Sequence, residues 1–195
     1  MVGAAAVISA LTVSLSPAVA RPDSQVRVQV AGLPGASALV VLHGGIASRG
    51  KWFQWVPLQR SGPDRWHAVL KTPGLYGIYP VRLRSARTML TTAATLQIVP
   101  PGFARQPGFD APAQVAQWWA WVAQPGVVVQ SVTTWRSGFY THRDPVLNRL
   151  LRVQFALLGN WPSMHLLRGN HVLYLSIART RAGAPWRLLQ TVAAP

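Results

Sequence analysis

The sequence predicts a mainly β protein with one α+β part: an antiparallel β-sandwich followed by a single helix on a four-stranded antiparallel meander. Three observations lead to this fold class. Short apolar runs alternate with polar residues and Gly/Pro turns up to residue 99, which is typical of half-buried strands. A Pro/Gly-rich stretch, 100–108, then reads as a linker, and only one segment after it has the spacing of an amphipathic helix.

Strands in the first half follow from period-two alternation. Val26, Val28 and Val30 alternate with Gln and Arg, and Tyr79, Val81 and Leu83 are expected on the opposite face from Arg82 and Arg84. We expect Gly44-Gly45 to break the apolar run 38–43, and Ser61-Gly62-Pro63-Asp64 to form a hairpin turn. The runs predicted as strands are 11–15, 25–30, 38–43, 52–58, 65–70, 75–83 and 90–99.

The second half begins with the predicted helix, 112–124. Asp110 is the expected N-cap, Pro112 lies in the first turn, and Pro125-Gly126 ends the helix. The strands predicted after it are 127–135, 147–158, 172–180 and 186–192. A helix followed by a meander predicts two packed layers.

Three stretches carry resemblances to known families. "VSLSPAVARPDSQVRVQVAGLP" and "DRWHAVLKTPGLYGIYPVRLR" resemble bacterial immunoglobulin-like domains of secreted proteins over about 8–99, with Asp23 where a Gly is usual. The tail "YLSIARTRAGAPWRLLQTVAAP" resembles the closing hairpin of nuclear transport factor 2-like and cystatin-like folds, and one helix before the sheet favours the cystatin-like form over 109–195. These resemblances imply a fold and an extracytoplasmic setting, and carry over no catalytic residue.

The N-terminus points to the same setting. Residues 1–20 contain an apolar run that ends in Ala18-Val19-Ala20, which is similar to a signal-peptidase site. Cleavage there would delete a good first strand. We therefore interpret only 1–7 as the remnant of a signal or anchor segment, and expect the protein to be secreted or anchored outside the cytoplasm.

The charge balance removes most enzyme classes. Nineteen basic residues stand against four acidic ones, all aspartate, for a net charge of +15 over 195 residues. General acid/base and metal-ion catalysis draw mainly on carboxylates, which are scarce here. Three accounts of the charge stay open: an anionic partner, an acidic habitat, and drift of an unselected surface. Basic residues form no Lys/Arg block, which argues against a nucleic-acid stripe.

Motif searches give no catalytic or metal site. The chain has no cysteine, which excludes disulfides and thiol chemistry. The pair His142 and Asp144 is interpreted as a strand-end turn and not as an oriented base. His165 and His171 could approach across a hairpin, but no histidine spacing matches a metal motif. We predict no cofactor, no metal and no catalytic residue.

Tryptophan is the more informative residue. Trp118, Trp119 and Trp121 share little more than one helical turn and cannot all enter one core, so Trp118 or Trp121 is expected at its margin. The candidate binding residues are the following: Trp118, Trp121, Lys51, Trp52, Arg82 and Arg84.

These features predict a non-catalytic cell-envelope interaction or accessory module, whose partner is an anionic envelope polymer, another envelope protein or a membrane surface. Two alternatives stay open. One is a small-molecule or enzymatic pocket between the helix and the meander, lined by Trp119, Trp135, His142 and Tyr174. The other is a structural subunit of a surface assembly.

Overall fold

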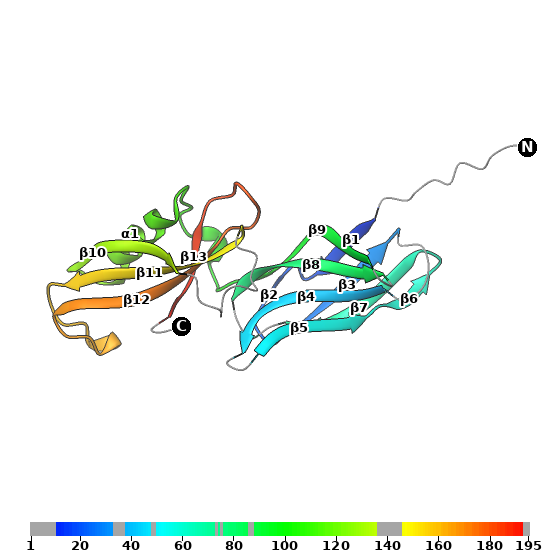
Figure 1. Cartoon of the computed structure of the whole chain (residues 1–195), viewed down its shortest axis with the longest axis horizontal. Helices are drawn as coiled ribbons and strands as arrows, with labels where there is room; N and C mark the ends of the chain where they lie inside the picture. Colours follow the sequence, from blue (N-terminus) through cyan, green and yellow to red (C-terminus); the bar gives the residue numbers. More distant parts are fainter. Residues whose placement is uncertain are drawn as a thin grey trace, which may run out of the picture.

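The computed structural model is mainly β, with three sheets and one α-helix (Figure 1). It describes residues 11–32, 38–47, 50–72, 74, 76–85, 88–135 and 146–192. The side chains of 38–47, 50–54, 85, 88–89 and 91 lie outside this description, as do residues 1–7, predicted as a signal or anchor remnant.

The first half forms two facing sheets. One has the order β1-β3-β7-β6 and the other β2-β9-β8-β4-β5. Their bounds are β1 Thr12–Ser16, β2 Val19–Ala20, β3 Gln25–Ala31, β4 Ala38–Ala47, β5 Gly50–Pro57, β6 Gln59–Gly62, β7 Arg65–Lys71, β8 Gly77–Ser85 and β9 Thr88–Ile98.

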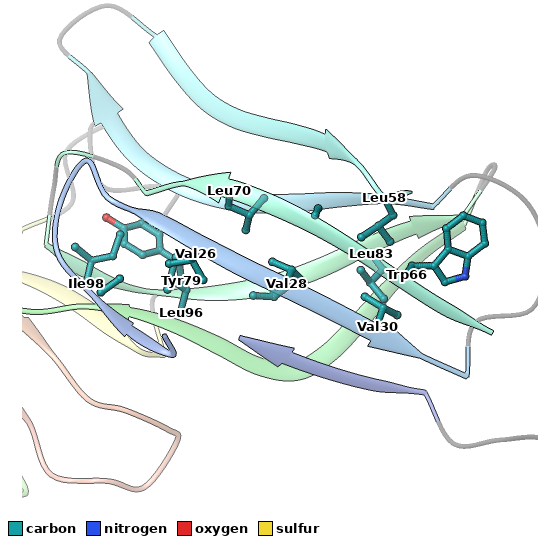
Figure 2. Packing of buried hydrophobic residues seen from close by; sticks show 13 residues of the cluster. Val26, Val28, Val30, Leu58, Trp66, Leu70, Tyr79, Leu83, Leu96 and Ile98 are labelled. Atoms are coloured by element: carbon teal, nitrogen blue, oxygen red, sulfur yellow. The ribbon is translucent and has the colours of Figure 1, made fainter. Parts of the chain in front are cut away.

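Alternating side chains fill the space between these sheets. On β3, Val26, Val28 and Val30 are buried while the residues between them are exposed. Figure 2 shows these valines between the two sheets, close to Tyr79, Leu83 and Leu96 of the other sheet. The period-two pattern therefore identified the inward face of β3 correctly.

Two details of the first half differ from the sequence predictions. The strand expected to break at Gly44-Gly45 continues to Ala47, and the pairing with β5 shifts register there, as glycines allow at a bulge. The sheets are antiparallel except at β2, which pairs in parallel with β9. The chain before β3 thus contributes to both sheets, with β1 in one and β2 in the other.

The second half is one helix on one face of a four-stranded antiparallel sheet of order β10-β11-β12-β13. Helix α1 begins with Ala111 as N-cap and not with Asp110, because the Ala111 N–H donates to Oε1 of Gln114 at 3.0 Å. The bounds are α1 Pro112–Ala123, β10 Val127–Trp135, β11 Asn148–Leu157, η2 Pro162–Met164, β12 Gly169–Ala178 and β13 Arg187–Val192.

The stretch predicted as a linker contains a short 3-10 helix, η1 (Phe103–Arg105), and it packs between the two halves. Phe103 is buried in a third apolar cluster with Ile78 from β8 and Leu147 and Leu189 from the second half. Asn148 adds two hydrogen bonds across this junction: its Nδ2 donates to the Ile78 carbonyl and its Oδ1 accepts from the Ile78 N–H, both at 2.8 Å. The halves share a packed junction.

Candidate functional site: a polar groove on the outer sheet face

The described part of the chain contains a groove on the outer face of the β1-β3-β7-β6 sheet. Its volume is about 700 Å³. It is open to solvent and no described element covers it. The residues that line it are Thr12, Ser14, Arg27, Gln29, Val30, Ala31, Ser61, Arg65, Trp66, His67 and Val69.

Strand alternation places these polar side chains outside. Along β7, Trp66, Ala68 and Leu70 are buried in the sandwich core, so Arg65 and His67 point to the opposite face. On β3 the buried valines leave Arg27 and Gln29 on the outer face in the same way. A sheet with one solvated face carries its polar residues there, and here they collect in a groove.

Hydrogen-bonding side chains form a row across the four strands. The register aligns Ser14 with Gln29, Gln29 with His67, and His67 with Gln59. At about 4.8 Å per strand, this row spans about 14 Å. Of these residues, Ser14, Gln29 and His67 line the groove, which therefore offers a hydroxyl, an amide and an imidazole to one ligand, a set suited to polar groups on an extended molecule.

Arg27 and Arg65 lie on either side of this row. Arg27 pairs with Val69, four residues along β7 from Arg65, so the two arginines are about 13 Å apart along the strands. Both side chains are exposed. Within the described residues, neither guanidinium makes a hydrogen bond or ion pair. Their charges are therefore available to a ligand.

Three other cations of the sandwich are engaged by the protein itself. Arg60 donates to the carbonyls of Gly62 and Pro63 at 3.1 and 2.9 Å, and Lys71 lies 3.6 Å from Asp23. Arg84 stacks 5.2 Å from the ring centroid of Trp55. Both groove arginines lack such partners among the described residues.

The groove lining contains no carboxylate. His67 therefore has no acidic partner in the lining to orient it as a base. No group of three metal-ligating side chains occurs among the residues that the structure covers. The arrangement can hold anionic and hydroxyl groups.

The predicted tryptophans of α1 divide by exposure. Trp119 is 4% exposed and packs on Phe155 and Trp161, with ring centroids 5.6 and 6.1 Å away. Trp118 is half-buried beside Phe109, and Trp121 is 82% exposed. The helical spacing required at least one indole at the margin of the core, and Trp121 lies well beyond it.

The other predicted binding residues lie on the second sheet of the sandwich, away from the groove. Arg82 and Arg84 are on β8, with Arg82 half-buried and Arg84 exposed over Trp55. Lys51 and Trp52 belong to β5, and their side chains lie outside the described residues. The structure therefore brings neither Arg82 nor Arg84 into the groove.

The predicted helix–sheet pocket residues are not brought together. Trp135 and Tyr174 make an edge contact, with ring centroids 5.6 Å apart. Trp119 lies on the other face of the sheet, because Leu173 and Leu175, which flank Tyr174 on β12, pack in its cluster. His142, with Asp144, lies outside the described residues. Apolar side chains fill the space between helix and sheet.

His165 and His171, which could have approached each other across a hairpin, do not do so in the structure. His171 lies against Phe155 at 5.6 Å between centroids, and its Nε2 is 2.6 Å from the Leu167 carbonyl. His165 is exposed at the end of η2, with a left-handed φ of 53°. No contact joins the two rings among the described interactions.

Sequence reasoning missed the groove residues Arg27, Gln29, Arg65 and His67. Alternation had already assigned Arg27 and Gln29 to an outer strand face. It could not show that β3 pairs with β7, which is the contact that brings Arg65 and His67 beside them. A search for polar outer faces on predicted strands would have found half of the groove.

Comparison with known proteins adds no identity: no family model, curated protein or solved structure matches this chain. None of the described helices has the length and apolar character needed to cross a bilayer.

Proposed function

We propose that this protein is a non-catalytic binding module that acts outside the cytoplasm and holds an anionic polymer of the cell envelope in the β1-β3-β7-β6 groove. The observation that carries this proposal is the pair Arg27 and Arg65, two exposed guanidiniums without described partners on either side of one groove. Planar guanidiniums bind phosphate, sulfate and carboxylate groups by paired hydrogen bonds.

The groove supports a polymer better than a small ion. A single anion would need both arginines to converge, and they are about 13 Å apart along the strands. An extended chain with repeated negative groups reaches both at once, and its hydroxyls meet Gln29 and His67 between them. The net charge of +15 draws such a polymer toward the protein from any side, while the groove gives it one place to dock.

Nucleic acid fits this groove less well. Single-stranded nucleic-acid sites usually offer exposed aromatic faces on which bases stack. The one aromatic side chain in the lining besides His67 is Trp66, which is buried in the sandwich core. The groove can contact the charged groups and hydroxyls of a polymer backbone. It offers no tryptophan or tyrosine ring on which bases could stack.

The finer fold assignments belong to this proposal. We propose that the sandwich is immunoglobulin-like and that the second half is cystatin-like. Two facing sheets around one core support the first assignment, and a helix packed on one face of a four-stranded sheet supports the second. Both would fit a protein of the cell envelope.

The test compares two double variants with equal charge. Arg27→Gln/Arg65→Gln removes the groove cations, and Arg105→Gln/Arg181→Gln removes two exposed arginines outside the groove whose side chains also lack partners among the described residues. Binding of the full chain to dextran sulfate, alginate and polyphosphate, with neutral dextran as blank, is measured by calorimetry over a salt series.

We expect the groove variant to lose about 10- to 100-fold in affinity, because charged hydrogen bonds contribute about 1.5–3 kcal/mol each and the polymer can partly compensate. The control variant should lose about twofold. Equal losses in both variants would show that the polymer responds only to net charge, and would overturn the proposal.

A further inference from the structure

The outward face of α1 carries an aromatic surface that the groove does not explain. Trp121 is 82% exposed, the most exposed of the large apolar side chains among the described residues. The helix sequence, PAQVAQWWAWVA, contains no charged residue, although the whole chain carries nineteen basic ones. An exposed indole on an uncharged helix presents an apolar ring face with a polar N–H, which a ligand can contact.

Helical geometry gathers four side chains on this face. Val115, Ala116, Trp119 and Ala120 are buried against the sheet. At 100° per residue, the opposite side of the helix presents Gln114, Gln117, Trp118 and Trp121.

Trp118 and Trp121 are three residues apart, so their Cβ atoms are neighbours at about 5–6 Å. Phe109 extends the surface, with its ring centroid 6.0 Å from that of Trp118. We name Phe109, Trp118 and Trp121 the aromatic ridge.

Folding does not require Trp121. The space between helix and sheet is filled by Trp119, which contacts Phe155 and Trp161. Trp121 faces away from this cluster and buries little of its surface in the protein. Its indole is therefore available to a ligand, and a smaller residue there would leave the core intact.

The size of the ridge argues against a protein partner. A helix of twelve residues is about 18 Å long, and a ridge about 10 Å wide along it presents about 200 Å². Stable protein interfaces bury about 800 Å² on each partner. The ridge alone matches a ligand of one or two rings.

Charge argues against an anionic membrane. Helices that lie on such membranes present Lys and Arg on their polar face. The polar residues of this face are glutamines, Gln114 and Gln117, which are neutral. The Oε1 of Gln114 accepts the Ala111 N–H, while Gln117 has no hydrogen-bond partner among the described residues. A neutral ligand with hydroxyl groups suits this face.

We propose that the aromatic ridge of α1 binds a neutral saccharide. A sugar ring stacks its apolar C–H face on the Trp121 indole, and the next ring of a chain lies toward Trp118. The amide of Gln117 donates to and accepts from the sugar hydroxyls. This site uses uncharged contacts, so it is independent of the groove and of the proposed polyanion.

The experiment titrates the full chain with neutral hexasaccharides of glucan, chitin and mannan type at low and high salt, by calorimetry. Trp121→Ala should lower affinity for the saccharide that binds by about tenfold, and Gln117→Ala by about threefold, as for one stacked ring and one neutral hydrogen bond. Trp135→Ala is the matched control, a tryptophan of the same half that lies outside the ridge. Thermal unfolding should show that Trp121→Ala is folded.

Four results would overturn this proposal. The first three are that no hexasaccharide binds, that binding survives Trp121→Ala, or that Trp135→Ala abolishes binding instead. The fourth is that Trp121 is needed for binding phosphatidylcholine vesicles or for self-association, and not for binding sugar. The groove variant Arg27→Gln/Arg65→Gln should bind the saccharide as the unmodified protein does, and high salt should not weaken it. Loss of polyanion binding and loss of saccharide binding are therefore separate outcomes.

Discussion

Two arginines of the sandwich groove and two arginines of the helix-covered half have opposite environments. In the groove of the sandwich, Arg27 and Arg65 are exposed and lack described partners. In the helix-covered half, Arg149 and Arg179 lie 4.9 and 4.7 Å from the ring centroid of Trp186, which is 2% exposed. Nε of Arg179 also donates to the Val146 carbonyl at 2.6 Å.

The difference teaches that net charge alone does not identify a binding surface. A guanidinium over a buried indole contributes to the fold through cation–π attraction and by covering apolar surface. A guanidinium on an uncovered sheet face contributes little to the fold and stays available to a ligand. We therefore expect an arginine that contributes much to stability to contribute little to binding, and the reverse. Mutation can test this.

Trp186→Ala should have the largest effect on stability. The indole packs in the core under α1, and its removal leaves a cavity and strips Arg149 and Arg179 of their stacking partner. We expect the free energy of unfolding to fall by about 3–5 kcal/mol, measured by urea denaturation. A loss below about 1 kcal/mol would mean that Trp186 and the two arginines over it contribute little to stability. These arginines would then not differ from those of the groove.

Asn148→Ala should have the next largest effect, because it leaves the buried N–H and carbonyl of Ile78 unpaired at the junction of the halves. We expect a loss of about 2–4 kcal/mol in urea denaturation. Gln130→Ala is the control, since its bond to Asn170 is an exposed pair of amides. Equal, small effects of both changes would show that the junction does not couple the halves.

Arg149→Gln/Arg179→Gln should have the smallest effect on stability, about 1–2 kcal/mol for two cation–π contacts near the surface. Polyanion affinity should change about twofold, as for any loss of two charges. Arg27→Gln/Arg65→Gln should show the reverse, with unfolding unchanged and affinity reduced. Calorimetric titration and urea denaturation on both proteins complete the comparison, and a groove variant that is the less stable of the two would contradict it.

Local pattern predicted much of the fold. The helix was expected at 112–124 and is found at Pro112–Ala123, and the run 127–135 forms β10 over the same residues. The N-cap was misassigned to Asp110: it is Ala111, whose backbone N–H donates to Oε1 of Gln114, and no side chain caps the helix. Gly44-Gly45 was misread as a break, because pairing with β5 carries the strand across the glycines.

The sequence likewise predicted some features of the candidate sites and missed others. Exposure of an indole on α1 followed from helical spacing, and Trp121 is the residue concerned. The groove did not follow, since it depends on β3 lying beside β7, a pairing between segments more than thirty residues apart. The pocket expected among Trp119, Trp135 and Tyr174 assumed one shared face, whereas these side chains lie on two faces of one sheet.

The sequence by itself determined the mainly β class, the single helix, the inward faces of the strands and the charge of +15, because these follow from periodicity and composition within short windows. Only the tertiary structure decided which arginines are engaged and which are free. That distinction depends on which strands pair and which aromatic rings come near each guanidinium, and such contacts are set by packing between distant segments of the chain.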